Sequence, residues 1–276
     1  NVMVTNGAKQ AIYNLFQVLL NDGDEVIIPA PYWLSYPQMV RLAGGKPIFV
    51  NSSAEDGFKI NLEDLKAKIS SKTKFIIINT PNNPTGRVMS KEELLQVAEL
   101  VRENKNINIL SDEIYELILK KDFKHFSLST LASDLQERIF IVNGFAKGWA
   151  MTGWRVGYLV GPKNIIKASS ALQSQSTSNV CSFVQRGALE ALKINHKFFE
   201  KINHQYDQRR DVLYEGLKNI EGILIHKPNG AFYAFPRLPD SSINSVEFCK
   251  RILNDYGLVL IPGKVFGDDK CFRISC

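Results

Sequence analysis

A lysine in the middle of the chain follows an apolar segment and is flanked by small and aromatic residues. Lys147 lies in the segment 143–155, which reads NGFAKGWAMTGWR. Burial at such a position would disfavour the charged ammonium, lower the pKa of the amine and leave it nucleophilic. Arg155, in the same segment, carries a planar group that can bind a phosphate through two hydrogen bonds. A surface loop lysine and an ion-paired arginine would look the same, so this segment alone leaves both interpretations open.

Three residues near the start of the chain lie between a predicted strand at 2–4 and a predicted helix at 8–20. The turn Gly7-Ala8-Lys9 leaves free backbone N–H groups at the beginning of that helix. These groups, together with the positive end of the helix dipole, can hold a phosphate. A plain strand–helix turn has the same composition, so the phosphate interpretation needs support from elsewhere in the chain.

Other polar and aromatic residues lie where predicted strands end. Asp112 and Tyr115 are three residues apart at the end of one strand, so both can face one site. The alternative roles are a helix N-cap for Asp112 and a turn former for Asn83, which lies in a Pro-Asn-Asn-Pro loop. Trp33 can stack on a flat ring or pack in the core. Arg273 alternates with apolar neighbours on the last predicted strand, where it can bind a carboxylate or lie at the surface.

Short apolar runs that alternate with helical patterns must position these side chains. Most runs are continuously apolar, which is typical of strands covered on both faces, and the alternation predicts a mainly parallel α/β sheet. The predicted strands are 25–29, 46–50, 74–79, 108–111, 138–143 and 158–160. The predicted helices include 8–20, 61–69 and 90–104, and the last opens with a capping box from Ser90 to Glu93.

The second half of the chain has a different pattern. Long helices are predicted at 181–192 and 196–219, followed by short strands at 223–226, 231–235 and 259–262 and a helix at 245–256. This arrangement predicts a smaller α+β domain, 206–276, joined to a large domain, 1–205. Both ends of the chain, 2–4 and 271–276, have the apolar pattern of buried strands, so we expect a chain excised from a longer protein.

The composition is that of a globular protein and excludes several classes. The 276 residues are 45% hydrophobic and 22% charged, and the net charge of +6 is spread without a basic block, so we expect no nucleic-acid partner. No segment approaches the roughly 18 apolar residues of a membrane span, and we expect a cytoplasmic protein without membrane contact. The four cysteines lack CxxC spacing and should be free thiols. The four dispersed histidines, without carboxylates at ligand spacing, predict no metal site.

The segment around Lys147 resembles the cofactor-lysine signature of class I aminotransferases, in the branch that contains bacterial aspartate aminotransferases. The resemblance extends, in the same order, over nearly the whole chain. The other matching motifs are Asn6-Gly7-Ala8-Lys9-Gln10, Pro29-Ala30-Pro31-Tyr32-Trp33, Pro81-Asn82-Asn83-Pro84-Thr85-Gly86, Ser111-Asp112-Glu113-Ile114-Tyr115-Glu116, Gly230-Ala231-Phe232-Tyr233 and Phe272-Arg273-Ile274-Ser275. Any single motif would be weak, whereas the ordered set is specific.

This resemblance implies the fold of pyridoxal-phosphate-dependent transferases, a mainly parallel seven-stranded sheet flanked by helices with a smaller α+β C-terminal domain. It also implies pyridoxal 5′-phosphate as the cofactor. Lys147 would form the Schiff base with it and move the substrate proton as general base and acid. Gly7, Ala8 and Lys9 would bind the cofactor phosphate together with Arg155.

The remaining matched residues would contact the cofactor ring and the substrate. Trp33 would stack on the pyridine ring, and Asp112 would keep the ring nitrogen protonated so that the ring accepts electrons from the substrate Cα. Tyr115 and Asn83 would hydrogen-bond the phenolic oxygen of the ring. Arg273 would bind the α-carboxylate of the substrate, and Trp33 and Asn83 would also line the substrate site.

Two features depart from the family pattern. Many relatives carry serines where this chain has Gly144 and Ala146, so we expect looser phosphate binding. We also expect that the family's leading segment, which covers the active site, and its terminal helices lie outside this chain, which leaves its activity open. Gln17 is a weak candidate for reading a distal carboxylate of the substrate.

The resemblance implies an aminotransferase that moves an amino group between an L-amino acid, expected to be aspartate, and a 2-oxo acid, expected to be 2-oxoglutarate. Ping-pong kinetics and a homodimer are expected with it. Two alternatives remain. One is a lyase on the same fold, which would release pyruvate and ammonia without an acceptor. The other is a truncated or regulatory remnant that holds the cofactor without turnover.

Overall fold

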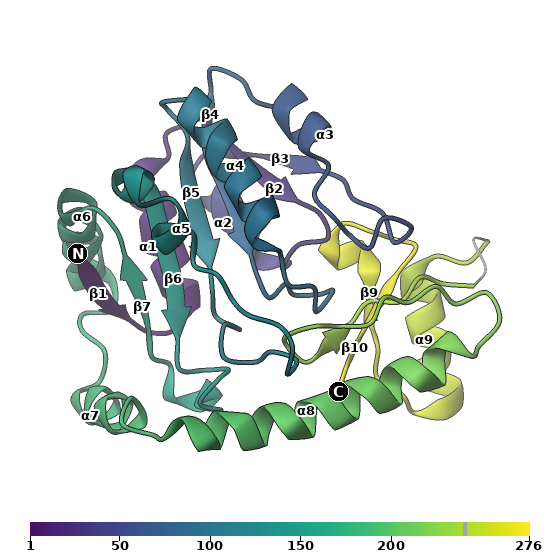
Figure 1. Ribbon diagram of the computed structural model, residues 1–276. Helices are drawn as coiled ribbons and strands as arrows, with labels where there is room; N and C mark the ends of the chain where they lie inside the picture. Colours follow the sequence, from purple (N-terminus) through teal and green to yellow (C-terminus); the bar gives the residue numbers. More distant parts are fainter. Residues whose placement is uncertain (240–241) are drawn as a thin grey trace.

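The computed structural model describes residues 1–239 and 242–276, which contain a large and a small sheet (Figure 1). The large sheet has seven strands in the order β1-β7-β6-β5-β4-β2-β3. These strands are β1 (Val2–Thr5), β2 (Glu25–Pro29), β3 (Lys46–Val50), β4 (Thr73–Asn79), β5 (Asn108–Asp112), β6 (Ile139–Gly144) and β7 (Gly157–Val160). β7 is antiparallel to its neighbours β1 and β6, and the other pairs are parallel. The predicted fold class is confirmed.

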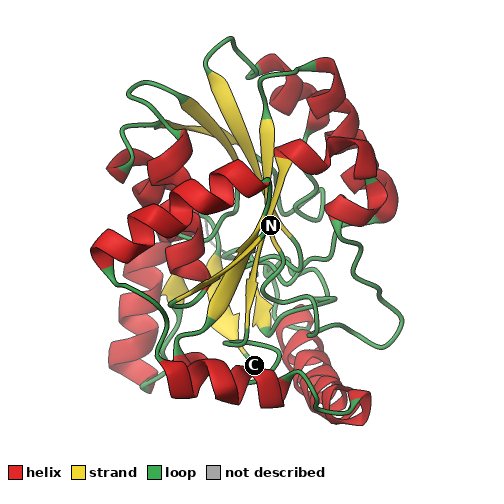
Figure 2. Cartoon of the chain, turned by 90° about the vertical axis from the view of Figure 1, so that its left-hand side faces the viewer, coloured by secondary structure: helices red, strands yellow, loops and turns green. Residues whose placement is uncertain are grey.

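Helices cover both faces of this sheet, as Figure 2 shows, because successive strand residues point to opposite sides. Val26 and Ile28 of β2 belong to the apolar cluster formed with α1 (Ala8–Leu19), α2 (Ser35–Leu42) and α6 (Lys163–Ser176). Ile27, between them, packs in the cluster on the other face, with α3 (Leu62–Ala67), α4 (Lys91–Glu103) and α5 (Leu128–Leu131). The continuous apolar runs of the sequence therefore reflect burial on both faces.

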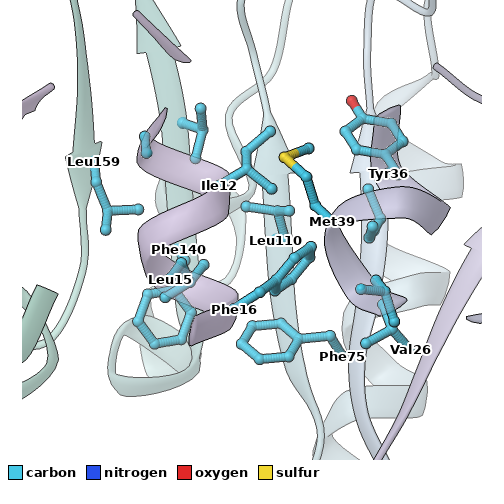
Figure 3. Close-up of a cluster of buried hydrophobic side chains, with 14 of the residues drawn as sticks. Ile12, Leu15, Phe16, Val26, Tyr36, Met39, Phe75, Leu110, Phe140 and Leu159 are labelled. Atoms are coloured by element: carbon cyan, nitrogen blue, oxygen red, sulfur yellow. The ribbon is translucent and has the colours of Figure 1, made fainter. Parts of the chain in front are cut away.

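Three phenylalanine rings tie α1 to the centre of the sheet (Figure 3). Phe75 of β4 meets Phe16 of α1 edge-on, with 5.6 Å between the ring centroids. It also meets Phe140 of β6 at 5.8 Å. All three side chains are fully buried. This contact fixes the position of α1, and with it the turn at which α1 begins.

Truncating the central ring should destabilise the whole fold. For Phe75→Ala we expect a loss of about 3–5 kcal/mol in the free energy of unfolding, because the lost apolar burial leaves a cavity between two other rings. Denaturant titration followed by circular dichroism measures it. Tyr256→Ala, at an exposed position, is the control and should change stability by less than about 0.5 kcal/mol. Equal effects of the two substitutions would contradict the assignment of Phe75 to the core.

The capping box predicted for the helix at 90–104 is present at the start of α4. The Ser90 hydroxyl accepts from the Glu93 backbone N–H at 3.2 Å, and the Glu93 carboxylate accepts from the Ser90 N–H at 2.8 Å. Two N–H groups that the helix itself cannot satisfy are thereby paired. The predicted bounds of this helix, 90–104, differ from those of α4 by one residue at each end.

The second half of the chain contains the long helices and the small sheet. The helices are α7 (Ser182–Ala191), α8 (His196–Lys218) and α9 (Ser245–Tyr256), and the sheet has the strand order β8 (Tyr233–Ala234), β10 (Phe272–Ser275), β9 (Ile261–Pro262). In Figure 1, α8 extends along the lower side from β6 and β7 to the small sheet. The predicted domain boundary at 205/206 falls inside this helix, and the division into two domains stays a prediction.

Three strands of this region were predicted too long. The segment 223–226 forms only an isolated bridge, from Leu224 to Arg237. In 231–235 only Tyr233 and Ala234 are extended, because Ala231 takes a positive φ of 50° that interrupts the strand. In 259–262 only the last two residues pair. Apolar runs of this length did not distinguish a strand from a buried irregular segment.

The chain also forms short 3₁₀ helices at Ser133–Arg138, Thr152–Trp154 and Gly263–Phe266. All four cysteines are free thiols, as predicted. Within the described residues, none of the helices combines the length and the apolar character that crossing a membrane requires.

Candidate active site

The predicted site residues meet at the carboxyl ends of the central strands. Asp112 is the last residue of β5, Lys147 follows β6, and Asn83 follows β4. Neighbouring parallel strands end at the same edge of a sheet, which is where ligands bind in open α/β sheets. A cavity of about 410 Å³ lies there, in the size range of small-molecule sites. Nine of the ten predicted site residues line it: Ala8, Lys9, Trp33, Asn83, Asp112, Tyr115, Lys147, Arg155 and Arg273.

Lys147 is half-buried, and its amine faces aromatic rings rather than open solvent. Its Nζ lies 5.8 Å from the centroid of the Tyr115 ring and 5.5 Å from that of Phe232. Burial lowers the pKa of the amine, and the positive charges of Arg273 and Arg155 lower it further. A lowered pKa increases the fraction of neutral amine, which is the form that attacks a carbonyl carbon.

Asp112 is the buried carboxyl of the site. Its Oδ2 accepts a hydrogen bond of 2.5 Å from the Tyr36 hydroxyl, and its Oδ1 accepts one of 3.2 Å from the Ile114 N–H. No helix begins at this position, so the alternative role as a helix N-cap is excluded. Burial raises the pKa of Asp112 to about 6, although both hydrogen bonds favour the carboxylate. A cationic partner in the cavity would favour the ionised form further.

The turn before α1 is shaped for an anion. Gly7 has a φ of 79°, and a Cβ at this residue would lie 2.4 Å from Nη2 of Arg155. The guanidinium of Arg155 therefore lies against the turn. α1 begins here without a side-chain hydrogen bond capping it. First-turn N–H groups next to an arginine provide both the dipole and the charge that a phosphate requires.

Arg273 is held between aromatic rings with its fork toward Asn83. Its Nη1 donates to Asn83 Oδ1 at 2.9 Å, and its Cζ lies 4.5 Å from the centroid of the Tyr233 ring and 4.9 Å from that of Phe266. Nε is buried without a hydrogen-bond partner among the described residues. A planar cation fixed in this way is ready to bind a carboxylate.

Trp33 is half-buried and lines the cavity, and its ring contacts that of Tyr36 edge-on at 5.3 Å between centroids. The Lys9 ammonium lies 5.0 Å from the centroid of the same indole. Lys9 thus has its backbone in the turn at which α1 begins, and its side chain lies beside an aromatic residue of the cavity. Trp33 also packs against the apolar cluster of α1 and α2, so it has a core contact as well as a place in the cavity lining, and its stacking on a ring stays a prediction.

Two site residues were missed from the sequence. Tyr36 lies in α2, and Figure 3 shows its hydroxyl pointing away from the apolar cluster in which its ring packs. Tyr233 lies in one of the matched motifs but had no role assigned. Both residues line the cavity. A polar aromatic on an apolar helix face was the only signal for Tyr36, and that signal is common among core residues.

The absence of a side chain at position 144 has a structural reason that the sequence did not reveal. A Cβ there would lie 2.8 Å from the Cα of Gly157 and 2.9 Å from the carbonyl oxygen of Val156. Because β6 and β7 approach this closely, a serine would not fit without moving the backbone. The neighbour Ala146 does line the cavity, so looser phosphate binding stays a prediction for that position.

Gln17 does not line the cavity. Its side-chain amide donates to the carbonyl of Leu42 at 3.1 Å, which ties α1 to α2. The suggestion that it reads a distal carboxylate is therefore wrong. The predicted helix placed Gln17 correctly on α1, but a period of 3.6 residues does not say which helix face meets a cavity and which meets another helix.

The histidines were predicted to have no carboxylate at ligand spacing, and His125 departs from that prediction, whereas the absence of a metal site stays a prediction. His125 Nε2 lies 3.1 Å from Glu113 Oε2, and the possible ligand atoms of His125, Glu113 and Glu116 are within 4.8 Å of one another. Glu113 Oε1 also accepts from Ser111 at 2.8 Å and from Ser127 at 2.9 Å. These bonds connect the end of β5 to the segment before α5, which supports the backbone next to Asp112.

Comparison with known proteins gives a consistent result. The family model described as aminotransferase class I and II matches residues 1–276. A probable aspartate/prephenate aminotransferase of Rickettsia felis is 44% identical over 99% of this chain and 69% of its own length. An aspartate aminotransferase of Bacillus subtilis is 43% identical, over 99% and 71%.

Solved structures agree. An aspartate aminotransferase from Rhizobium meliloti superimposes with a TM-score of 0.95 at 35% identity, over 99% of this chain and 71% of that one. An aromatic aminotransferase from Pyrococcus horikoshii gives 0.95 at 38%, over 99% and 74%.

Fold and relatives together define the chain as an enzyme of the pyridoxal-phosphate-dependent transferase class. It belongs to the aminotransferase class I and II family.

Proposed function

We propose that this chain binds pyridoxal 5′-phosphate and transfers the amino group of aspartate to a 2-oxo acid, with 2-oxoglutarate as the expected acceptor. The observation that carries the proposal is the placement of Lys147 in one cavity with a buried carboxyl, Asp112, and with Arg155, whose guanidinium lies against the turn at Gly7. These three features match the aldehyde, the ring nitrogen and the phosphate of this cofactor.

The residues present fit this group in charge and in shape. Gly7 leaves the space over the turn to Arg155, where a larger residue would displace the guanidinium. Asp112 is buried, so a protonated ring nitrogen would meet an unscreened carboxylate. When bound, pyridoxal phosphate supplies an aldehyde carbon that joins to amines and a protonated ring that takes up the electron pair of the substrate Cα.

The chain's own groups would perform the remaining tasks. Lys147 would hold the cofactor covalently and, once released by the substrate, carry the proton from the substrate Cα through its neutral amine. Asp112 would keep the ring nitrogen protonated. Arg273 would bind the α-carboxylate and orient the Cα bond, and Tyr115 and Asn83 would hydrogen-bond the ring oxygen. Trp33 would stack on the ring and help exclude water.

The charges of the cavity support a dicarboxylic substrate. Among the described lining residues four are cationic, Lys9, Lys147, Arg155 and Arg273, and Asp112 is the carboxyl. Lys147, Arg155 and Arg273 are matched by the cofactor aldehyde, the phosphate and the α-carboxylate. Lys9 is left to meet a second carboxylate. The names of the relatives, which include aspartate aminotransferase, point the same way.

The 276-residue chain with added pyridoxal phosphate tests the proposal. We expect a visible absorption band, covalent attachment at Lys147 after borohydride reduction, and loss of the band when aspartate is added without an acceptor. Stoichiometric oxaloacetate should appear with that loss, and 2-oxoglutarate should restore the band. Pyruvate and ammonia instead would select a lyase, and a band that aspartate does not change would select an inactive remnant.

Lys9 provides a test of substrate choice. Lys9→Met should raise KM for aspartate roughly tenfold to a hundredfold, because a charge-assisted hydrogen bond to the distal carboxylate is lost, while kcat changes little. Activity toward an aromatic amino acid should stay within a factor of about two. Lys167→Met on α6 is a control. Parallel losses with both substrates would show that Lys9 serves the cofactor phosphate instead.

We further propose that two copies of the chain associate through a face next to the site. Trp154, the neighbour of Arg155, lies against Gly187 of α7, and Phe183, one turn earlier on α7, is 71% exposed. Trp154 is itself 45% exposed. Exposed aromatic side chains of this size favour a protein contact. Light scattering should give twice the chain mass, and Phe183→Glu should shift it to the single-chain mass at micromolar concentration. An unchanged mass for Phe183→Glu would place the contact elsewhere.

A further inference from the structure

Tyr233 lines the cavity and contacts both Tyr115 and Arg273. It is buried in β8, where it pairs with Ser275 of β10, the strand that carries Arg273. On its other side it reaches Tyr115, which comes from the segment after β5. No task in the proposed function uses Tyr233, although both its ring and its hydroxyl contact residues that have one.

The hydroxyl of Tyr233 lies 3.0 Å from that of Tyr115, and both residues are buried. A phenol has one proton to donate and lone pairs that accept. If Tyr115 donates its proton to a ligand oxygen, its own oxygen is free to accept the proton of Tyr233. The two hydroxyls then form a chain that points into the cavity. In such a chain each bond polarises the next and strengthens it.

The ring of Tyr233 has a second contact. The Arg273 guanidinium lies over it, with Cζ 4.5 Å from the ring centroid, while Nη1 of Arg273 is bound to Asn83 at 2.9 Å. Cation–π contact and hydrogen bond together fix the plane of the guanidinium. Tyr233 therefore contacts Arg273 through its ring and Tyr115 through its hydroxyl. One substitution can remove the hydroxyl and keep the ring, and another can remove both.

We propose that Tyr233 is a positioning residue whose hydroxyl donates to Tyr115 and strengthens the hydrogen bond from Tyr115 to the ring oxygen of the cofactor, while its ring holds Arg273 for the substrate α-carboxylate. This inference rests on the proposed cofactor. Donated hydrogen bonds stabilise negative charge on the ring oxygen. With the cofactor attached to Lys147, the Lys147 nitrogen would then release its proton at lower pH, and loss of the Tyr233 hydroxyl would raise that pH.

The test is a pH titration of the visible absorbance of the chain loaded with pyridoxal phosphate, for wild type, Tyr233→Phe, Tyr115→Phe and the double variant. We expect Tyr233→Phe to raise the midpoint by about 0.3 to 1 pH unit and Tyr115→Phe to raise it further. In the Tyr115→Phe background, Tyr233→Phe should add nothing, because its effect passes through Tyr115. Tyr214→Phe, on α8, removes a hydroxyl outside the cavity and should leave the midpoint unchanged.

The ring is tested by a second substitution. Tyr233→Leu should raise KM for aspartate roughly threefold to thirtyfold beyond the value for Tyr233→Phe, which keeps the ring. Thermal unfolding of each variant separates this effect from loss of the fold. An unchanged titration midpoint in Tyr233→Phe overturns the inference, and so does a Tyr233→Phe shift of the same size in the presence and absence of the Tyr115 hydroxyl. A visible band in the wild type leaves the proposed function standing in either case. A wild type without a visible band overturns both.

Discussion

Replacing Lys147 by alanine should lower kcat/KM for amino transfer by about 10⁴-fold or more, because both the covalent attachment of the cofactor and the carrier of the Cα proton are lost. The structure provides no substitute amine at this place: the other lysine of the cavity among the described residues, Lys9, has its amine against Trp33, 5.0 Å from the ring centroid. Initial rates with aspartate and 2-oxoglutarate measure the effect. Mass spectrometry after borohydride reduction should show no covalent adduct in the variant.

Two controls distinguish chemistry from folding. Lys167→Ala, at an exposed position on α6, should retain full activity. A small primary amine in the buffer should restore part of the activity of Lys147→Ala, since an external base can move the proton where the side chain no longer does. If the activity of Lys147→Ala stayed within tenfold of the wild-type activity, Lys147 would not be the residue that holds the cofactor and moves the proton.

Replacing Asp112 by asparagine should lower kcat roughly 10²- to 10³-fold while the cofactor still binds. The amide has nearly the same shape, and its oxygen can still accept from Tyr36, but it has no charge with which to hold a proton on the ring nitrogen. A neutral ring is a weaker electron acceptor, so the loss falls on the step that breaks the Cα–H bond. A deuterium isotope effect on that bond should therefore increase in Asp112→Asn, whereas a merely structural defect would leave it unchanged.

Asp112 should also make the stability of the apoprotein depend on pH. Burial raises the pKa of Asp112 from 3.8 to about 6 in the cofactor-free fold. The folded state thus binds this proton more tightly than the unfolded chain, and stability falls as pH rises from about 4 to 6, by at most about 3 kcal/mol. Asp112→Asn lacks this penalty. Its stability relative to the wild-type apoprotein should therefore rise by up to about 3 kcal/mol between pH 4 and pH 8.

The affinity for pyridoxal phosphate should also depend on the protonation of Asp112, but protonation should weaken binding whereas it stabilises the apoprotein. The wild type should bind pyridoxal phosphate more weakly as pH falls below about 6, because Asp112 becomes neutral. The cofactor phosphate gains a proton near pH 6 as well, and that contribution is common to both proteins. The difference between the wild type and Asp112→Asn therefore isolates the carboxyl. Equal pH profiles would show that Asp112 does not meet a cationic group of the cofactor.

The sequence by itself determined the class of fold and the edge of the sheet at which the site lies. Continuous apolar runs require cover on both faces, and alternation with helices requires parallel strands whose carboxyl ends meet. Asp112 ends β5 and Lys147 follows the neighbouring strand β6, so their proximity follows from topology. The same reasoning failed at 223–226 and 231–235. The first segment follows a turn at Gly222, the second begins in a turn at Ala231, and an apolar run carries no information about pairing partners.

Only the tertiary structure decided which side chains support the site residues. Tyr36 reaches Asp112 across 76 residues of sequence, and Tyr233 reaches Tyr115 across 118. His125 meets Glu113 because the chain returns after β5, and Gly144 lacks a side chain because β7 passes within 3 Å of where its Cβ would be. Local patterns specify which face of an element is buried. They do not specify which distant residue arrives there, and that depends on how complete elements pack.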